Sequence, residues 1–236
     1  MTINGKGKII GDRYSHHGNN GEWGMCLTLS GNNISVRGIT INDAWGDCIY
    51  ITGKSNNVLI EKCHIERGRR QGISIISASH VAIKNCYIND IGGIDPEYAV
   101  DVEPNKNCTV DDVQISNVYV RRCKGAFTAN GRAQGSHVGK FNIRDCDVQA
   151  EGKPVVIASK VDEISVRDCI IKQSSGDRVI AFDQVDKLHF INNEINYKTN
   201  LGNRIMSKTK AIMGLGTWPM IITKCKHTEM YSNKGL

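Results

Sequence analysis

Carboxyl side chains at spacings suited to acid–base chemistry occur between residues 45 and 105. Asp101 and Glu103 are alternate residues of one predicted strand, so both point to the same face, roughly 6.5–7 Å apart at the backbone. Glycoside-cleaving enzymes use a carboxyl pair, separated by about 6.5–9.5 Å in inverting and about 5–5.5 Å in retaining enzymes. Asp47 lies two predicted turns away, on the order of 10 Å at the backbone. We therefore predict Asp47, Asp101 and Glu103 as candidate catalytic residues.

The side chains around these carboxyl groups indicate an acidic sugar as the ligand. A planar guanidinium matches a carboxylate in two-donor geometry, and the adjacent Arg69 and Arg70 precede a predicted strand. In an elimination reaction they would neutralise a uronate carboxylate while a base removes the neighbouring ring proton. Aromatic side chains would provide flat platforms for sugar rings. The predicted substrate-binding residues are Arg69, Arg70, Gln71, Tyr50, Trp45, Tyr98, Asn105 and Arg132.

Several of these residues also have an interpretation without catalysis, and both interpretations remain open. Asp101, Glu103 and Arg70 could form a solvated ion-pair ladder that holds neighbouring turns together. Trp45 could cover the interior of an early turn, and Arg132 could be an exposed surface charge. Calcium prefers oxygen ligands, and no other cofactor or metal is indicated. The residues that could supply oxygen ligands to calcium are Asp95, Glu97, Asp101 and Glu103.

A repeat of alternating apolar residues must position these side chains. Each copy has two apolar positions in alternation, a two-residue break, and two more apolar positions in alternation. Alternation with period two is typical of strands, and Asn or Asp in the break tolerates a left-handed bend. The copies begin at Ile34, Val58, Val81, Val113, Phe141, Ile164 and Leu188, with a weaker eighth copy at Met220. Asn or Asp occupies the break at Asn85, Asn117, Asp145, Asp168 and Asn192.

A third short strand precedes each of the first seven copies, so each turn contains three strands. The copies start 24, 23, 32, 28, 23, 24 and 32 residues apart. Stacking such turns at about 4.8 Å gives three parallel sheets around an apolar interior. We predict an all-β solenoid, a parallel β-helix of about eight to nine turns, over residues 1–196. Residues 197–236 are expected to form an irregular last turn with a cap or an oligomer contact.

The third strands are predicted to form the functional face of this solenoid. Extra residues in a solenoid leave through the loops, and the widest gaps in mid-chain place loops beside this face, around 91–98, 104–112 and 130–139. Two outward columns are predicted on it. The first column is Tyr50, Ser74, Asp101 and Thr128, and the second is Thr52, Ile76, Glu103 and Asn130.

Composition and charge exclude several other classes of protein. The chain has 236 residues and a formal net charge of +6, but its Lys and Arg are dispersed, so no nucleic acid partner is expected. No charged and apolar leader and no run of about 18 apolar residues is present, so we expect neither a signal peptide nor a membrane partner. Nine cysteines with no Cys-x-x-Cys pair indicate reduced apolar fillers rather than a zinc site. Whether the chain belongs to a longer protein stays open.

The repeat resembles the right-handed parallel β-helix superfamily of pectate lyases, polygalacturonases and phage tail-spike depolymerases. The resemblance covers about residues 3–195, and the right-handed coil that it implies agrees with the general crossover rule. The stretches 46–49 and 71–75 are similar to the polygalacturonase motifs Asp-Asp-Cys and Gly-His-Gly-Ile/Leu-Ser-Ile, with Asp47 at one catalytic position. Gly46 replaces the other Asp and Gln71 replaces the His, so the resemblance does not carry the pectinase mechanism over.

A wider set of motifs looks more like the β-helix region of phage tail-spike and pre-neck-appendage proteins and related bacterial proteins. The motifs lie at residues 21–24, 45–47, 69–74 and 101–105. The resemblance implies binding and cleavage of an acidic host surface polysaccharide by hydrolysis or elimination, in a homotrimer, in a virion tail or at a cell surface or secreted. A binding-only adhesin or structural spike, and a pectinase-like or epimerase enzyme of a bacterium, are the alternatives.

Overall fold

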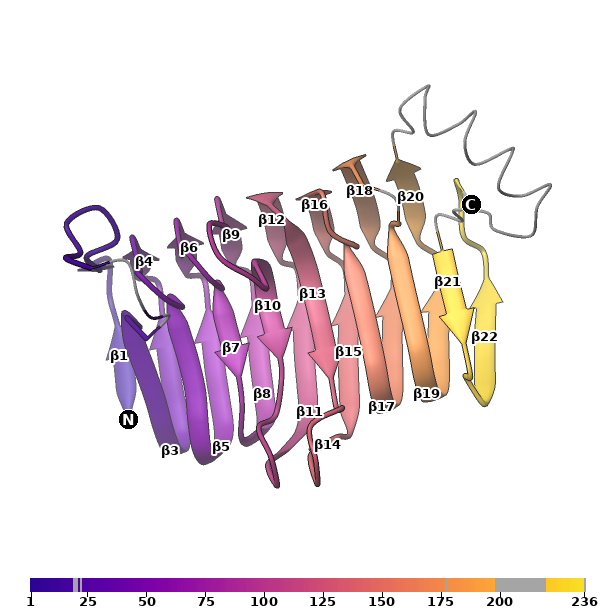
Figure 1. Ribbon diagram of the computed structural model, residues 1–236, viewed down its shortest axis with the longest axis horizontal. Coiled ribbons are helices and arrows are strands. Elements are labelled where there is room, and N and C mark those ends of the chain that lie inside the picture. The colour runs from indigo at the N-terminus through magenta and orange to yellow at the C-terminus, as the bar shows by residue number, and fades with distance from the viewer. Residues whose placement is uncertain (19–20, 22, 177, 198–219, 236) are drawn as a thin grey trace.

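The computed structural model describes residues 1–18, 21, 23–176, 178–197 and 220–235. These residues form parallel strands and no helix. Figure 1 shows the strands stacked side by side along the long axis, with the two termini at opposite ends. The predicted all-β parallel solenoid is therefore confirmed.

One sheet of eight strands forms a complete wall of the solenoid, which we call the third face. Each of its strands comes from a different turn, because every pairing joins a strand to one that lies a whole turn away in sequence. Its strands are β2 (Lys8–Ile10), β4 (Thr40–Asn42), β6 (His64–Glu66), β9 (Tyr87–Asn89), β12 (Tyr119–Cys123), β16 (Asp147–Glu151), β18 (Ile170–Ser175) and β20 (Glu194–Tyr197).

The other fourteen strands form a second, bent sheet that supplies the two remaining walls. The long strands β3, β5, β17 and β19 each continue through the bend, so two of the three predicted sheets are continuous with each other. We call residues 27–30, 49–52, 73–75, 98–102, 125–130, 156–159, 180–183 and 220–223 the first face. We call residues 34–37, 58–61, 81–84, 113–116, 141–144, 164–167, 188–191 and 228–231 the second face. The strands are β1 (Thr2–Asn4), β3 (Leu27–Arg37), β5 (Ile49–Glu61), β7 (Ile73–Ile75), β8 (Ala78–Lys84), β10 (Tyr98–Val102), β11 (Thr109–Ser116), β13 (Gly125–Asn130), β14 (His137–Val138), β15 (Lys140–Arg144), β17 (Val156–Arg167), β19 (Ile180–Ile191), β21 (Met220–Thr223) and β22 (His227–Tyr231).

The bend between the second and third faces depends on residues in the left-handed backbone region. All five Asn and Asp residues predicted there have a φ between 52° and 55°. An ordinary L-residue is strained in this region, whereas Asn and Asp are several-fold enriched in it. Their side chains also join neighbouring turns: Asn117 donates to Asn85 over 2.7 Å, and Asn192 donates to Asp168 over 2.5 Å. The sequence pattern therefore predicted the corner correctly.

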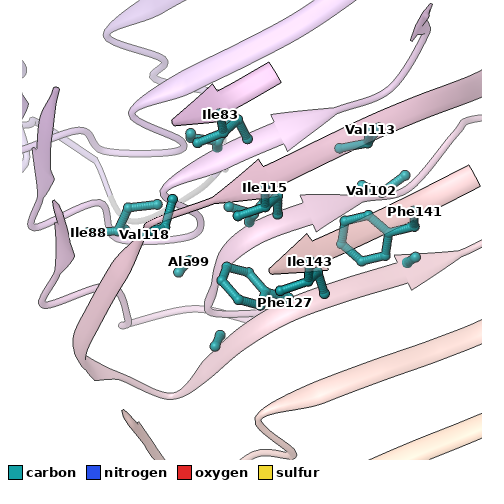
Figure 2. Packing of buried hydrophobic residues seen from close by; sticks show 14 of the residues in the cluster. Ile83, Ile88, Ala99, Val102, Val113, Ile115, Val118, Phe127, Phe141 and Ile143 are labelled. Carbon is teal, nitrogen blue, oxygen red and sulfur yellow. The ribbon is translucent and has the colours of Figure 1, made fainter. Parts of the chain in front are cut away.

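Stacked apolar columns fill the interior of the solenoid. Ile83, Ile115 and Ile143 occupy one register on β8, β11 and β15, and Figure 2 shows their side chains in line with Phe127 and Phe141 nearby. Each of these residues is at most 1% exposed. Because identical positions of successive turns lie about 4.8 Å apart, each turn buries the apolar surface of the next.

Cysteines belong to this interior as apolar fillers. All nine are free thiols, and six of them are buried. Burial raises the pKa of Cys123 to about 12, and a thiol that stays protonated is a poor nucleophile. The six buried cysteines therefore have the predicted role of reduced apolar fillers.

The last described turn corrects one part of the predicted repeat. The copy beginning at Met220 was aligned with the copy at Leu188, but β21 pairs with Ile180–Asp183 of β19 on the first face. The strand that pairs with Leu188 is β22. Its sequence, His-Thr-Glu-Met-Tyr, has little apolar alternation. The repeat pattern therefore matches the more apolar β21 instead of β22. Most of the predicted irregular segment, residues 198–219, lies outside the described residues.

Candidate functional site

The first face carries the two outward columns that the repeat predicted. Ser74 pairs with Tyr50 on one side and with Asp101 on the other, and Asp101 pairs with Thr128. Three successive turns therefore bring Tyr50, Ser74 and Asp101 next to one another. Glu103 was expected on the same strand as Asp101, but β10 ends at Val102 and Glu103 begins the following loop, where its amide donates to the Ile75 carbonyl of the preceding turn. The expected register of the first column is confirmed.

Asp47 is enclosed by residues of the following turn. Its side chain has no exposed surface, and Arg70 Nη1 lies 3.2 Å from Oδ1 and 3.0 Å from Oδ2. The Ser74 hydroxyl also donates to Oδ2 over 2.7 Å. A buried carboxylate needs such a cation and such donors to offset its lost hydration. Asp47 and Arg70 thus form a buried ion pair, which differs from the solvated ladder of Asp101, Glu103 and Arg70 considered above.

Gln71 joins its own turn, which follows the turn of Asp47, to the turn of Asp101. Its Nε2 donates to Asp101 Oδ2 over 2.5 Å, and its Oε1 accepts the Tyr98 amide proton over 2.7 Å. Both atoms of the amide are used, and Gln71 has no exposed surface. The sequence predicts Gln71 as a substrate contact. In the structure its buried side chain instead links two neighbouring turns.

Asp101 is in an environment that favours its protonated form. Burial raises the pKa of Asp101 well above the ordinary aspartate value, and the nearby Glu103 and Asp47 carboxylates raise it further, against the opposing effects of Arg70 and Gln71. Only 2% of Asp101 is exposed, whereas Glu103 is partly exposed. Two carboxyl groups separated by one residue at the end of β10 thus differ in solvent access, a difference that separates acid and base roles in many active sites.

Tyr50 forms the exposed side of this cluster together with the loop that follows β10. Its pKa is raised by burial and by Asp47, and lowered by Arg70 and by a hydrogen bond with the Asn105 side chain. Trp23, which is 73% exposed, meets the Tyr50 ring edge-on with 6.3 Å between centroids. The predicted contacts Tyr50 and Asn105 are therefore brought together beside the carboxyl groups.

A polar cavity of about 340 Å³ opens at the corner beside this loop. Asn107, Cys108 and Thr109, which follow Asn105 in the same loop, form part of its lining. Cys108 also lies close enough to Tyr50 to raise the pKa of Tyr50. In Figure 1 the loops after β10 and β13 extend past the lower ends of the strands. The cavity is lined by Lys54, Ser55, Ser77, Ala78, Ser79, Asn107, Cys108 and Thr109.

Trp45 and Arg69 contact each other and the N-terminal segment. The Arg69 guanidinium carbon lies 3.8 Å from the centroid of the Trp45 ring, and the His16 ring stacks on Trp45 at 4.1 Å. Arg69 Nη1 donates to the Gly21 carbonyl over 3.1 Å, and the Trp45 indole donates to the same carbonyl over 3.2 Å. These predicted substrate contacts therefore hold His16 and Gly21 against the start of the first face.

Two other predicted contacts are placed less directly at the cluster. Arg132 donates to Ser159 over 2.7 Å and pairs with Asp183, on turns beyond Asp101. Tyr98 is only 6% exposed, and its ring lies where a Cβ on Gly125 would be. The Tyr98 ring therefore packs against Gly125 of the next turn, while its backbone amide donates a hydrogen bond to Gln71.

The structure does not assemble the calcium ligands considered from the sequence. Lys153 pairs with Asp95 and, over 3.1 Å, with Glu97. Asp101 is buried on the first face, where it accepts a hydrogen bond from Gln71. Among the described residues, no group of three or more His, Cys, Asp or Glu side chains could hold a metal ion. Within the same residues, no helix has the length and hydrophobicity needed to cross a membrane.

Ser74 is the member of the cluster that sequence reasoning left without a role. It was expected in the outward column, but its hydrogen bond to Asp47 was not anticipated. The signal was its position in the column directly between Tyr50 and Asp101. Because a serine is short, it can reach back to an acidic residue of the preceding turn and still be covered by its neighbours.

Known proteins from a bacterium share part of this sequence. The chain is 26% identical over 184 residues to the "SPbeta prophage-derived uncharacterized protein YorA" of Bacillus subtilis (strain 168), covering 69% of this chain and 28% of that protein. It is 30% identical over 141 residues to the "Uncharacterized protein YclG" of the same organism, covering 51% of this chain and 24% of that protein. The matches thus span about a quarter of the length of either relative.

Among solved structures, the A-module of the Azotobacter vinelandii mannuronan C-5 epimerase AlgE6 is similar, with a TM-score of 0.42 and 10% identity. That match covers 86% of this chain and 64% of the other. Residues 2–139 match the family described as "Right handed beta helix region", which is more than half of the chain. Together with the stacked parallel sheets, this match shows that the chain belongs to the right-handed β-helix family.

Proposed function

We propose that the first face binds an acidic polysaccharide and cleaves it, with Asp101 as general acid and Glu103 as general base. The observation that carries this proposal is the pair itself. A buried carboxyl group with a raised pKa, Asp101 on β10, lies two residues before the partly exposed carboxyl group of Glu103, just past the end of that strand. Such a pair has the unequal environments by which active sites separate an acid from a base, which supports acid–base cleavage of a glycosidic bond.

Each reaction uses the two groups in a defined way. In hydrolysis, the Asp101 carboxyl proton passes to the glycosidic oxygen as the bond to the anomeric carbon breaks, while Glu103 takes a proton from the attacking water. In elimination, Glu103 removes the ring proton next to the uronate carboxylate, and Asp101 protonates the departing oxygen. Arg70 and Ser74 hold Asp47 beside these groups, so Asp47 acts as a fixed charge that maintains the cluster.

The surroundings of the pair support a sugar chain as the substrate. Tyr50 and Trp23 present aromatic rings, and Asn105 and the hydroxyl-lined cavity beside it offer hydrogen-bonding groups. A sugar chain bound across the strands would pass from Glu103 to Tyr50 and reach the cavity beside the loop that carries Asn105. The printed name of one relative refers to a prophage, which supports a phage-derived protein that acts on a host surface polysaccharide.

The test is depolymerisation of acidic polysaccharides by the wild type and by Asp101→Asn and Glu103→Gln. A positioned acid or base contributes about 10²–10⁴-fold to rate, so each variant should lose activity by that factor while remaining folded at the assay temperature. Asp162→Asn, an exposed carboxyl far along the chain, is the matched control and should keep full activity. Ultraviolet absorbance of an unsaturated uronate in the product indicates elimination, and its absence with chain shortening indicates hydrolysis. Unchanged depolymerisation in both variants would exclude these roles.

A second candidate, a protein that binds the polysaccharide without cleaving it, is favoured by one observation. Asp47 and Asp101 are 0% and 2% exposed, as expected for groups that join turns rather than meet a substrate. In that case the wild type would bind glycans of a panel without shortening them. A change in sugar configuration without shortening would indicate an epimerase instead.

A further inference from the structure

The second face carries a column of basic residues far around the coil from the carboxyl cluster. Arg144 on β15 pairs in register with Arg167 on β17, and the next position on the other side is Ser116 on β11. Lys84 on β8 follows Ser116 in the same column. No acidic residue interrupts this stretch of the column. Three of these four positions are basic, and together they form a basic stripe over four consecutive turns, interrupted only by Ser116.

The positive charges of Arg144 and Arg167 repel each other unless an anion neutralises them. Like charges directly opposite each other on neighbouring strands destabilise a sheet. The same column avoids this at its other end, where Arg37 is paired with Glu61 at 3.4 Å. Arg144 donates to Asp145 over 2.7 Å, but that pair is exposed, with 64% and 49% of the side chains accessible. Exposed pairs of this kind contribute little.

Arg167 has donors left over for a ligand. Its Nε donates to the Ser165 hydroxyl over 2.7 Å, which fixes the direction of the guanidinium group. Within the described part of the chain, no carboxylate lies within ion-pair distance of Arg167. The neighbouring corner residue Asp168 instead accepts a hydrogen bond from Asn192. The two terminal amino groups of Arg167 therefore remain available in a preset orientation.

A hollow of about 320 Å³ lies between these side chains. Two short serines, Ser116 and Ser165, stand in neighbouring columns between longer residues, and this difference in length creates the depression. Amide groups of Gln114 and Asn142 complete its polar rim. The hollow thus combines two guanidinium groups with hydroxyl and amide groups on three adjacent strands, β11, β15 and β17.

We propose that this hollow is a binding site for a sugar unit that carries an oxyanion, either a carboxylate or a phosphate ester. The two arginines would hold the oxyanion in forked hydrogen bonds. The serine hydroxyls and the Gln114 and Asn142 amides would bind the sugar hydroxyl groups. The site lies on a different face from Glu103 and stands whether or not the first face cleaves anything.

The test measures binding of three probes to the full chain by calorimetry: a tetragalacturonate, glucose 6-phosphate and the neutral maltotetraose. At least one acidic probe should bind saturably, and maltotetraose should not bind at this site. Arg167→Gln should weaken acidic binding about tenfold or more, the value of one charge-assisted hydrogen bond. Arg37→Gln, which removes an equal charge from the same column, should leave the affinity within about twofold. Comparing the two acidic probes identifies which oxyanion is preferred.

Stability provides a second readout. Without ligand, Arg167→Gln should keep or raise the Tm, because it removes the repulsion from Arg144. A lower Tm would instead mark Arg167 as a structural residue and overturn the proposal. Equal weakening by Arg167→Gln and Arg37→Gln would mean a general charge effect, and the absence of saturable binding of both acidic probes would likewise refute the site. Asp101→Asn tests the first face separately and should leave this binding unchanged.

Discussion

Gln71 and Asp101 lie 30 residues apart in sequence and are joined by a buried hydrogen bond from Nε2 to Oδ2. The same side-chain amide accepts the Tyr98 backbone amide proton, so one side chain satisfies two buried polar groups of β10. Without Gln71, a carboxyl group and a backbone N–H would both be buried without this partner.

Gln71→Leu should lower the free energy of unfolding by about 2–5 kcal/mol, because each buried polar group left unsatisfied costs about 1–3 kcal/mol. Chemical denaturation measures the loss. Gln134→Leu changes the same residue type on an exposed loop and should shift stability by no more than about 0.5 kcal/mol. Similar losses in the two variants would show that the Gln71 hydrogen bonds are not what stabilises the three turns.

Asp101 should make stability depend on pH in the opposite direction from a usual aspartate. Its folded-state pKa is raised by burial, so above the unfolded value of about 3.9 the folded state holds more protons. Stability then falls as pH rises from about 3.9 through the folded pKa, by at most about 1.4 kcal/mol per pH unit. Asp101→Asn cannot ionise, so denaturation curves of the two proteins should diverge over this window. Parallel pH profiles would show that Asp101 is not buried as described.

Arg70→Met should destabilise the protein by about 3–5 kcal/mol, because it removes a cation from a fully buried carboxylate. The additional change Asp47→Asn should recover part of this loss. The matched control is Arg122→Met, whose partner Asp90 and own side chain are 35% and 59% exposed, and which should cost no more than about 1 kcal/mol. Thermal and chemical denaturation compare them, and equal costs would contradict the burial of the Asp47–Arg70 pair.

Asn117 tests the left-handed corner. Its φ is 52°, so Asn117→Ala should be less stable than Asn117→Gly by about 1 kcal/mol, since only glycine adopts this region without strain. The reverse order is expected at Asn32, an exposed residue inside β3, where glycine costs more than alanine. Unfolding free energies of the four variants decide the matter. The same order at both positions would show that backbone strain does not govern the corner.

The sequence alone determined the solenoid, because alternation with period two predicts the strands and indicates which of their side chains point into the interior. Asn and Asp at the breaks predicted the corners, since few other residues tolerate a positive φ. The same local pattern failed at β22, where the strand His227–Tyr231 has almost no apolar alternation to mark its register. Its placement comes from pairing with β19, a long-range contact that no local pattern contains.

The candidate site was predicted in its columns but not in its contacts. Alternation placed Asp101 and Glu103 on the outside of the coil, yet outside the coil is not the same as exposed to solvent. Arg70, Ser74 and Gln71 come from neighbouring turns and enclose Asp47 and Asp101. Which outward residues are covered depends on side chains of adjacent turns and on loops that fold back, such as the one carrying Asn105. Those contacts form only when the turns stack, so the tertiary structure alone decided which carboxyl group is buried and which remains accessible.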